Sequence, residues 1–373
     1  MDNPFKKILK EGIALFSSSS SSGQSVIGID IGSSSIKVVQ LKKKGGKAIL
    51  ETYGALALGP YTESDVGAVT NLPTEKLSQA LTDVVRESGV TVKDGAMSIP
   101  SAASLIFVIE LPKAIEEKQL PEIIPTEARK YIPVPVSEVS LDFWVIPKKE
   151  ESQLENSTTP TNDKTEVLIA AIHNDTISKY KDIIKTTDLT TSFFEIEVFS
   201  AIRATFSHEL STVLLMDFGA AKTKLSIVEY GIVKSFHIVN RGSADITNAL
   251  SRSLNISFAH AEEMKREFGL FGSADKNVGE ITKLSVDYIL NETSTVILNY
   301  EKKYNRTVSK IIICGGGSML KGFYDSARSH FTSPVELGNP FGKVEAPAFL
   351  EQVLKTTGPE FAVAVGLALR KLQ

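Results

Sequence analysis

The chain has 373 residues, enough for two to three domains at roughly 150 residues per domain. Hydrophobic residues make up 42% and charged residues 23%, which excludes collagen-like, coiled-coil and wholly disordered classes. The 41 Lys and Arg against 44 Asp and Glu give a net charge of −3, so no overall positive charge favours nucleic acid. One cysteine allows neither an internal disulfide nor a cysteine-rich zinc site, and it indicates a reducing cytoplasm.

The first 24 residues are predicted to form a flexible N-terminal tail. Residues 5–16 place apolar side chains on one face of a helix beside lysines, so a membrane-surface or partner-binding helix is the alternative. Six serines at 17–22 follow, and such a run is typical of a tether. We expect neither export nor a membrane span, because the sequence has no signal-peptide core and no run of about 18 apolar residues.

The rest of the chain alternates strand-like and helix-like patterns in two stretches. In the first, the predicted strands are 26–32, 36–41, 48–58, 96–100, 104–111, 139–146 and 166–172, with helices over 74–88 and 116–131. The second stretch begins at about Ser211. Its predicted strands are 213–219, 223–229, 233–239 and 311–314, its predicted helices lie between 243 and 304, and a final helix covers 360–372. Residues 95–172 therefore predict a self-contained β-β-α-β-β unit.

An internal echo links the two stretches. Residues 30–37 and 217–224 share the pattern D-x-G-x4-K, and each copy follows an apolar strand and leads into another. Similarity at half the chain length indicates two related halves.

The repeated pattern suits phosphate binding. A glycine turn with small neighbours exposes backbone N–H groups to phosphate oxygens, and an aspartate at the strand end can hold hydrated Mg²⁺ through water. Two such hairpins facing across a cleft would clamp the β- and γ-phosphates of a nucleotide. The alternative is a pair of ordinary hairpins with glycine turns.

A third motif lies at 314–318, where three glycines and a serine follow the strand ending in Cys314. The glycines would let a flat adenosine approach the backbone, and Ser318 could cap the following helix; a plain strand-to-helix turn is the alternative. The Walker A motif and the G-x-G-x-x-G fingerprint are both missing from the sequence, which excludes P-loop and Rossmann binding.

At these three motifs the chain resembles the superfamily of actin, heat-shock chaperones and sugar kinases. Residues 25–41 resemble the opening signature of the PilM family of type IV pilus assembly proteins, in the FtsA-like subgroup. The resemblance implies an α/β, actin-like (ribonuclease H-like) two-lobed ATPase fold with a small α+β subdomain inserted in the first lobe. The implied domains are a tail (1–24), a first lobe (25–94) with its insertion (95–172), the first lobe and connecting helix (173–210), a second lobe (211–345, with a helical subdomain at 243–308) and a C-terminal return to the first lobe (346–373).

The same resemblance assigns the site residues and the cofactors, ATP and Mg²⁺. Glu197 would position the attacking water, and Asp30 and Asp217 would hold Mg²⁺ through water. Glu262, Lys265 and Arg266 would sandwich adenine and ribose, unless they form only a solvated helix face. The nucleotide-binding set is Asp30, Gly32, Ser33, Ser34, Lys37, Asp217, Gly219, Ala220, Lys222, Thr223, Glu262, Lys265, Arg266, Gly315, Gly316, Gly317 and Ser318. Because Ala220 and Ala221 replace the hydroxyl-rich turn of strong ATPases, we expect at most slow hydrolysis.

The resemblance further implies a cytoplasmic adaptor at the inner face of the cytoplasmic membrane. Its partner would be the N-terminal cytoplasmic peptide of a PilN-like bitopic inner-membrane protein, with no nucleic acid and only indirect membrane contact. The peptide would dock in a groove between the 95–172 insertion and the first lobe, using the strand at 104–111 as an edge. An FtsA/MreB-like cytoskeletal filament protein and a small-molecule kinase remain alternatives. No candidate catalytic aspartate for a kinase is evident. The sequence stops at Gln373, directly after the last superfamily helix, which favours PilM over FtsA. Self-association stays open.

Overall fold

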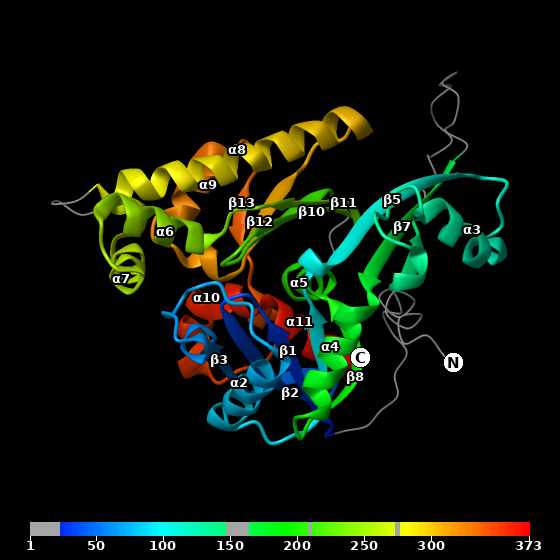
Figure 1. Ribbon diagram of the computed structural model, residues 1–373. Helices are drawn as coiled ribbons and strands as arrows, with labels where there is room; N and C mark the ends of the chain where they lie inside the picture. The colour runs from blue at the N-terminus through cyan, green and yellow to red at the C-terminus, as the bar shows by residue number, and fades with distance from the viewer. Residues whose placement is uncertain (1–22, 147–163, 208–210, 273–276) are drawn as a thin grey trace.

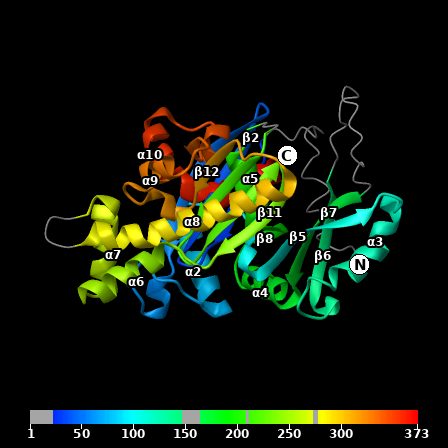
Figure 2. The ribbon, with the colours of Figure 1, turned by 90° about the horizontal axis from the view of Figure 1, so that it is seen from above.

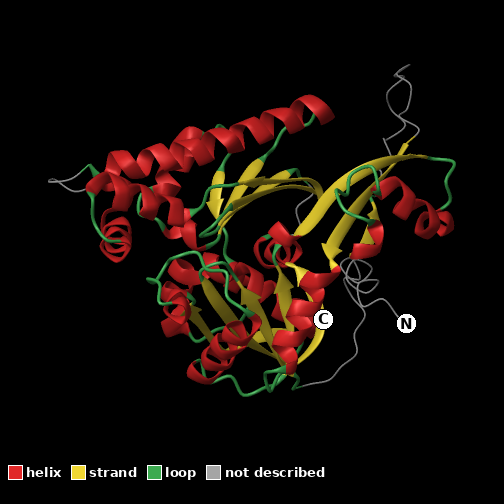
Figure 3. Cartoon of the chain, in the orientation of Figure 1, coloured by secondary structure: helices red, strands yellow, loops and turns green. Residues whose placement is uncertain are grey.

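A computed structural model describes residues 23–146, 164–207, 211–272 and 277–373. Residues 1–22 of the predicted tail fall outside these residues, and with them the alternative tail helix and the serine run. The described chain forms two lobes, each built on a five-stranded sheet, and a smaller unit with a three-stranded sheet (Figure 1; Figure 3).

The first lobe has the sheet order β3-β2-β1-β4-β8. Alternating residues of β1 pack into different clusters: Ile27 and Ile29 pack with α2, whereas Val26 packs with α11. The strands are β1 (Ser25–Ile31), β2 (Ser35–Lys44), β3 (Lys47–Ala57), β4 (Asp94–Ile99) and β8 (Thr190–Ile196). The helices are α2 (Thr74–Glu87), α4 (Asn174–Lys185), α5 (Glu197–Thr205), α10 (Glu351–Thr357) and α11 (Ala362–Leu372).

The inserted unit is smaller than the sequence predicts. The strand expected at 96–100 is β4, which pairs in parallel with β1 and β8 and so lies inside the first lobe's sheet. Assigning that strand to the insertion was therefore wrong, because a short apolar run does not show which sheet will receive it. The insertion itself has the antiparallel order β5-β7-β6, formed by β5 (Ser104–Pro112), β6 (Val139–Val145) and β7 (Lys164–His173).

The insertion's helix is also shorter than expected. Helix α3 spans Leu120–Ala128, where 116–131 was predicted, and a separate 3-10 turn precedes it. Pro121 occupies its first turn and Pro125 lies inside it. Proline fixes φ and removes a backbone donor, which limits how far a helix extends.

The second lobe repeats the first lobe's topology. Its sheet order is β11-β10-β9-β12-β13. When the strands of each lobe are numbered along the chain, both sheets have the order 3-2-1-4-5. Its strands are β9 (Val213–Phe218), β10 (Thr223–Glu229), β11 (Ile232–Val239), β12 (Lys310–Cys314) and β13 (Val335–Leu337). Its helices are α6 (Ser243–Leu254), α7 (Phe258–Phe268), α8 (Val278–Tyr304) and α9 (Phe323–His330). The two related halves inferred from the internal echo are confirmed.

Helices α5 and α11 cross at very short range beneath the second lobe (Figure 1). A Cβ added at Gly366 of α11 would lie 1.9 Å from the carbonyl oxygen of Ser200 in α5. Gly28 permits a similar approach of α11 to β1, because a Cβ there would lie 2.0 Å from the carbonyl oxygen of Ala364. The small residues of these two helices therefore permit a close crossing. Among the described residues, no helix is both long and apolar enough to cross a membrane.

Candidate functional site

The two D-x-G hairpins have the same turn. Gly32 donates its N–H to the carbonyl of Ser35, and Gly219 donates to the carbonyl of Lys222, both at 3.0 Å. Strand pairing sets Asp30 opposite Lys37 and Asp217 opposite Lys224. The repeated pattern therefore encodes a tight glycine turn with an acid and a base facing each other across the strands.

Asp30 is a buried acid in the first hairpin. Its Oδ1 accepts a hydrogen bond from Ser98 Oγ of β4 at 2.8 Å. Burial raises the pKa of Asp30 to about 6, against the opposing effect of the Lys37 ammonium. Lys37 is itself buried, and its Nζ donates to Ser35 Oγ at 2.9 Å. A cation bound nearby would favour the ionised form of Asp30.

Lys224 joins the two lobes at the centre of the site. Its Nζ lies 2.9 Å from Oδ2 of Asp217 and 2.9 Å from Oε2 of Glu197, which begins α5 of the first lobe. Burial alone would lower the pKa of Lys224, but the carboxylates of Asp217 and Glu197 outweigh it and raise that pKa. Lys224 is the last residue of the second D-x-G-x4-K pattern, yet the predicted site omitted it.

Glu195 and Glu197 have separate surroundings although they stand two residues apart. Glu197 accepts a hydrogen bond from the Ser101 N–H at 2.7 Å and pairs with Lys224. Glu195 is completely buried and pairs with Arg203 of α5 at 2.7 Å and with Arg370 of α11 at 2.6 Å. Glu197 therefore connects the two lobes, whereas Glu195 ties the two crossing helices to β8.

The trio on α7 is not a solvated face. Glu262 Oε2 accepts hydrogen bonds from Lys265 Nζ and from Thr247 Oγ1 of α6, both at 2.6 Å, and Arg266 Nε donates to Oε1 at 2.7 Å. Glu262 and Lys265 are buried, whereas the side chain of Arg266 is 63% exposed. The alternative that these three residues form only a solvated helix face is therefore wrong for Glu262 and Lys265.

A loop of the first lobe reaches both the first hairpin and α7. The N–H of Thr70 donates to the carbonyl of Ser33 at 2.9 Å, and that of Leu58 donates to the carbonyl of Ser34 at 2.9 Å. A Cβ at Gly67 of the same loop would lie 2.8 Å from Cδ of Glu262. The loop therefore places the α7 trio close to the first turn.

The three glycines after β12 have different surroundings. Gly315 has a φ of +85°, and a Cβ there would lie 2.4 Å from Oδ1 of Asp217; a Cβ at Gly317 would lie 2.6 Å from the ring of Phe218. Gly316 is exposed, and a Cβ there would meet nothing nearer than Glu360 Oε2 at 4.0 Å. Ser318 is buried and donates Oγ to the Gly315 carbonyl at 2.6 Å. Only Gly316 offers open backbone to a ligand.

The second turn is tied to α6. The N–H groups of Ser243 and Ala244 donate to the carbonyls of Gly219 and Ala220, each at 3.0 Å. Thr223 is completely buried and donates Oγ1 to the carbonyl of Arg241 at 2.9 Å, which uses the hydroxyl that was expected to face phosphate. All the residues of the two turns, 32–35 and 219–222, are partly exposed.

The carboxylates where the two lobes meet fit a hydrated magnesium ion. Asp30 and Asp217 supply carboxylate oxygens, the ligand type that Mg²⁺ prefers, and Mg²⁺ usually keeps several waters. Within the described parts of the chain, no three His, Cys, Asp or Glu side chains are close enough to hold a metal directly. The contact of Asp30 and Asp217 with Mg²⁺ through water stays a prediction.

The structure thus brings the three sequence motifs and Glu197 together through Lys224, Gly67 and Gly315. Besides Lys224, the predicted site lacked Ser98 and Thr247, which hold Asp30 and Glu262. Ser98 is 68 residues from Asp30 in the chain and Thr247 is 15 from Glu262. Neither hydroxyl carries a local motif, so only the folded chain could reveal them.

Comparison with known proteins identifies the family. The model of the family described as "Type IV pilus assembly protein PilM" matches residues 28–372. The chain belongs to this family. A solved structure called "PilM-PilN type IV pilus biogenesis complex" aligns with a TM-score of 0.78 and 23% identity, covering 93% of this chain and 98% of that one. The actin-like fold predicted from the sequence is confirmed.

Two further similarities agree with the fold. The cell division protein FtsA of Helicobacter pylori is 27% identical over 185 residues, which is 43% of this chain and 37% of that protein. The chain thus matches little more than a third of this curated relative's length. The structure of the ethanolamine utilization protein EutJ from Carboxydothermus hydrogenoformans aligns with a TM-score of 0.52 and 14% identity, covering 97% of this chain and 93% of that one.

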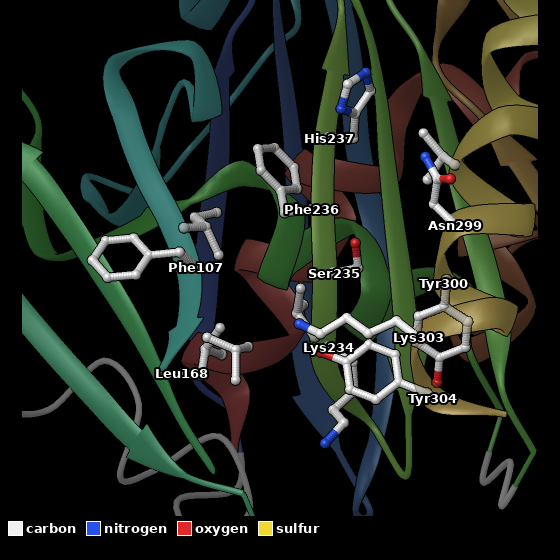
Figure 4. Close-up of a pocket in the computed structure, with 14 residues that line it drawn as sticks. Phe107, Leu168, Lys234, Ser235, Phe236, His237, Asn299, Tyr300, Lys303 and Tyr304 are labelled. Atoms are coloured by element: carbon white, nitrogen blue, oxygen red, sulfur yellow. The ribbon is translucent and has the colours of Figure 1, made fainter. Parts of the chain in front are cut away.

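A separate pocket of about 310 Å³ lies between the insertion and the second lobe (Figure 4). One wall is β5, an edge strand of its sheet, and the others are β11 and α8. Lys234 of β11 is buried and pairs with Glu166 of β7, so this ion pair joins the two units. The strand at 104–111 does lie at a sheet edge, but the pocket beside it is bounded by the second lobe, where the sequence predicted the first.

Proposed function

We propose that the chain is an ATP-binding, actin-like adaptor of type IV pilus assembly that works in the cytoplasm at the inner face of the membrane. Its partner is the N-terminal cytoplasmic peptide of a PilN-like membrane protein. The observation that carries the nucleotide part is the pair of identical D-x-G turns on the two lobes, joined through Lys224. Membership of the PilM family supports the pilus role, and a related structure is named as a PilM-PilN complex.

In this proposal the two turns hold the phosphates. The backbone N–H groups around Ser33, Ser34 and Ala220 are partly exposed and donate to phosphate oxygens, while Lys37 and Lys222 supply positive charge. Gly316 provides the open backbone against which the adenosine lies, and Arg266 covers it from α7. Bound Mg²⁺ neutralises phosphate charge when it enters with ATP.

Hydrolysis is slow in this proposal because the candidate water-positioning group is already engaged. Glu197 Oε2 pairs with the Lys224 ammonium, and Oε1 accepts the Ser101 N–H. A carboxylate with both oxygens occupied is a weak acceptor for a proton from water. Nucleotide binding then serves to hold the lobes in one arrangement, with little turnover.

The partner peptide docks as an added strand in the pocket beside β5. Both β5 and β11 are edge strands, so each has an unpaired row of backbone groups on one side. Extended peptides bind such edges through main-chain hydrogen bonds and place alternate side chains in pockets. Ile106 and Val108 of β5, together with Leu168, supply apolar lining.

The test is a titration of a synthetic peptide from the partner's cytoplasmic N-terminus, followed by fluorescence anisotropy. We expect Val108→Asp to weaken binding at least about tenfold, because it buries an unpaired charge at the interface. Val353→Asp is the matched control, since Val353 of α10 is 46% exposed and does not line the pocket. Equal affinity for Val108→Asp and the unaltered chain would place the peptide elsewhere, and no binding at all would refute the adaptor role.

A test that deletes the insertion must leave the first lobe's sheet intact. Removing 95–172 would take out most of β4, which lies between β1 and β8. A deletion that starts after Ser101 spares this strand and the Ser101 N–H that holds Glu197.

The local match to FtsA favours one alternative, a cytoskeletal filament protein. Nucleotide-dependent pelleting in the ultracentrifuge would support it. Phosphate transfer from ATP to a small metabolite would instead support a kinase.

A further inference from the structure

Helix α8 carries an exposed strip on the surface of the second lobe. Figure 2 shows this helix running across the molecule as seen from above. The side of α8 that packs on the core holds Val286, Ile289 and Leu290, all completely buried. Its outer side exposes three large hydrophobic residues instead: Leu284 at 73%, Tyr288 at 49% and Leu298 at 49%.

The exposed residues follow a regular spacing. Leu284, Tyr288, Asn291, Thr295 and Leu298 recur at alternating steps of four and three residues, and all are exposed. That spacing keeps side chains on one side of a helix and is the seam pattern of paired helices. The strip is therefore shaped to meet another helix lengthwise.

The strip is also complementary to itself when reversed about Asn291. In an antiparallel pair centred there, Leu284 of one copy meets Leu298 of the other, and Asn291 meets Asn291. The exposed Glu280 meets Lys302 at both ends, so the terminal contacts join opposite charges. Lys283 and Asp287 face Asn299 and Thr295, and Tyr288 faces Ser294, so none of these six pairings sets like charges opposite each other.

We propose that a second copy of this chain packs its α8 antiparallel onto this strip, about a two-fold axis at Asn291. A two-fold contact uses the same patch on both copies and closes on itself, so it forms a dimer and not a filament. The central Asn pair would fix the register, a role that single buried Asn residues have in paired helices. With three large apolar residues per copy, the dimer is weak and forms at high local concentration.

Cysteine cross-linking tests the register. The single native cysteine, Cys314, is buried, so cross-linking would occur through the introduced exposed thiol. Asn291→Cys should form a disulfide-linked dimer under mild oxidation, since the two residues meet at the axis. Lys302→Cys is the control: its two copies would lie roughly 33 Å apart at 1.5 Å per residue, and it should link only when mixed with Glu280→Cys.

Charge reversal tests the energetics without a covalent bond. Glu280→Lys or Lys302→Glu alone should raise the dimer dissociation constant about three- to tenfold in analytical ultracentrifugation, and the double variant should restore it. Leu284→Arg should abolish the dimer. The proposal fails if Asn291→Cys links no faster than Lys302→Cys, if the double variant is not restored, or if the chain stays monomeric at every concentration.

Discussion

Glu195 and Glu197 show how strongly local surroundings determine what a glutamate does. Both are buried, but one is neutralised by two arginines of the crossing helices and the other by the lysine that spans the lobes. Burial alone would raise the pKa of Glu195, yet Arg203 and Arg370 hold it below its usual value. The first carboxylate therefore stabilises the structure, and the second faces the candidate reaction centre.

We predict that residual ATP hydrolysis depends on Glu197. Glu197→Gln should slow single-turnover hydrolysis at least about tenfold, because a positioned carboxylate that accepts a proton contributes this much or more. Glu195→Gln is the control and should change hydrolysis far less, provided that it is assayed where it stays folded. Equal rates for both variants and the unaltered chain would mean that neither glutamate positions water.

Glu195→Gln should instead reduce stability. Removing the charge leaves Arg370, which is 7% exposed, without its buried partner, and such a loss costs about 3 to 5 kcal/mol. The ion pair stabilises the chain fully above pH 4.5, the ordinary value for Glu, and this contribution falls as acid protonates the native carboxylate. Urea unfolding should thus show a large gap between the two proteins at pH 7 that narrows below pH 4.5. A gap independent of pH would contradict the ion pair as its cause.

At the scale of elements, neighbouring glycines in the turn after β12 have different predicted roles: Gly317 is needed for packing, and Gly316 for nucleotide binding. Gly317→Ala should destabilise the chain by about 1 to 3 kcal/mol, because its Cβ would lie 2.6 Å from the Phe218 ring. Gly316→Ala should leave the melting temperature unchanged but weaken nucleotide binding, since its Cβ would enter the open space proposed for adenosine. Thermal unfolding with and without ATP measures both effects, and equal behaviour of the two variants would refute the division of roles.

The sequence predicted elements well where local chemistry determines them. The strands expected at 26–32, 36–41 and 48–58 are present as β1, β2 and β3, and the strands expected at 223–229 and 233–239 meet at a turn in which Gly231 has a φ of +80°. The assignment of β4 failed because sheet membership depends on pairing with β8, almost 100 residues later. The predicted site was incomplete for a similar reason: Lys224 was visible in the motif, but its pairing with Glu197 arises only when the lobes meet.

At the scale of the molecule, the duplicated topology explains why the site lies where it does. Each lobe places its first hairpin at the same position in its sheet, so two lobes facing each other bring two identical turns together. The connection between them is polar: Lys224 pairs with Glu197, and the loop at Gly67 approaches Glu262. A polyanion bound between the two turns would contact groups from both lobes at once.

We therefore expect ATP with Mg²⁺ to stabilise the whole chain. A ligand that binds only the folded state adds about 2.7 kcal/mol at a concentration one hundred times its Kd, which corresponds to a melting-temperature increase of several degrees. Asp30→Asn and Asp217→Asn should each reduce the part of this increase that disappears when EDTA removes the metal. Lys93→Ala is the control, because Lys93 pairs with Asp188 at the exposed surface. A double Asp variant that kept the full metal-dependent increase would refute the assignment of these two residues, and no increase in the unaltered chain would refute nucleotide binding in the cleft.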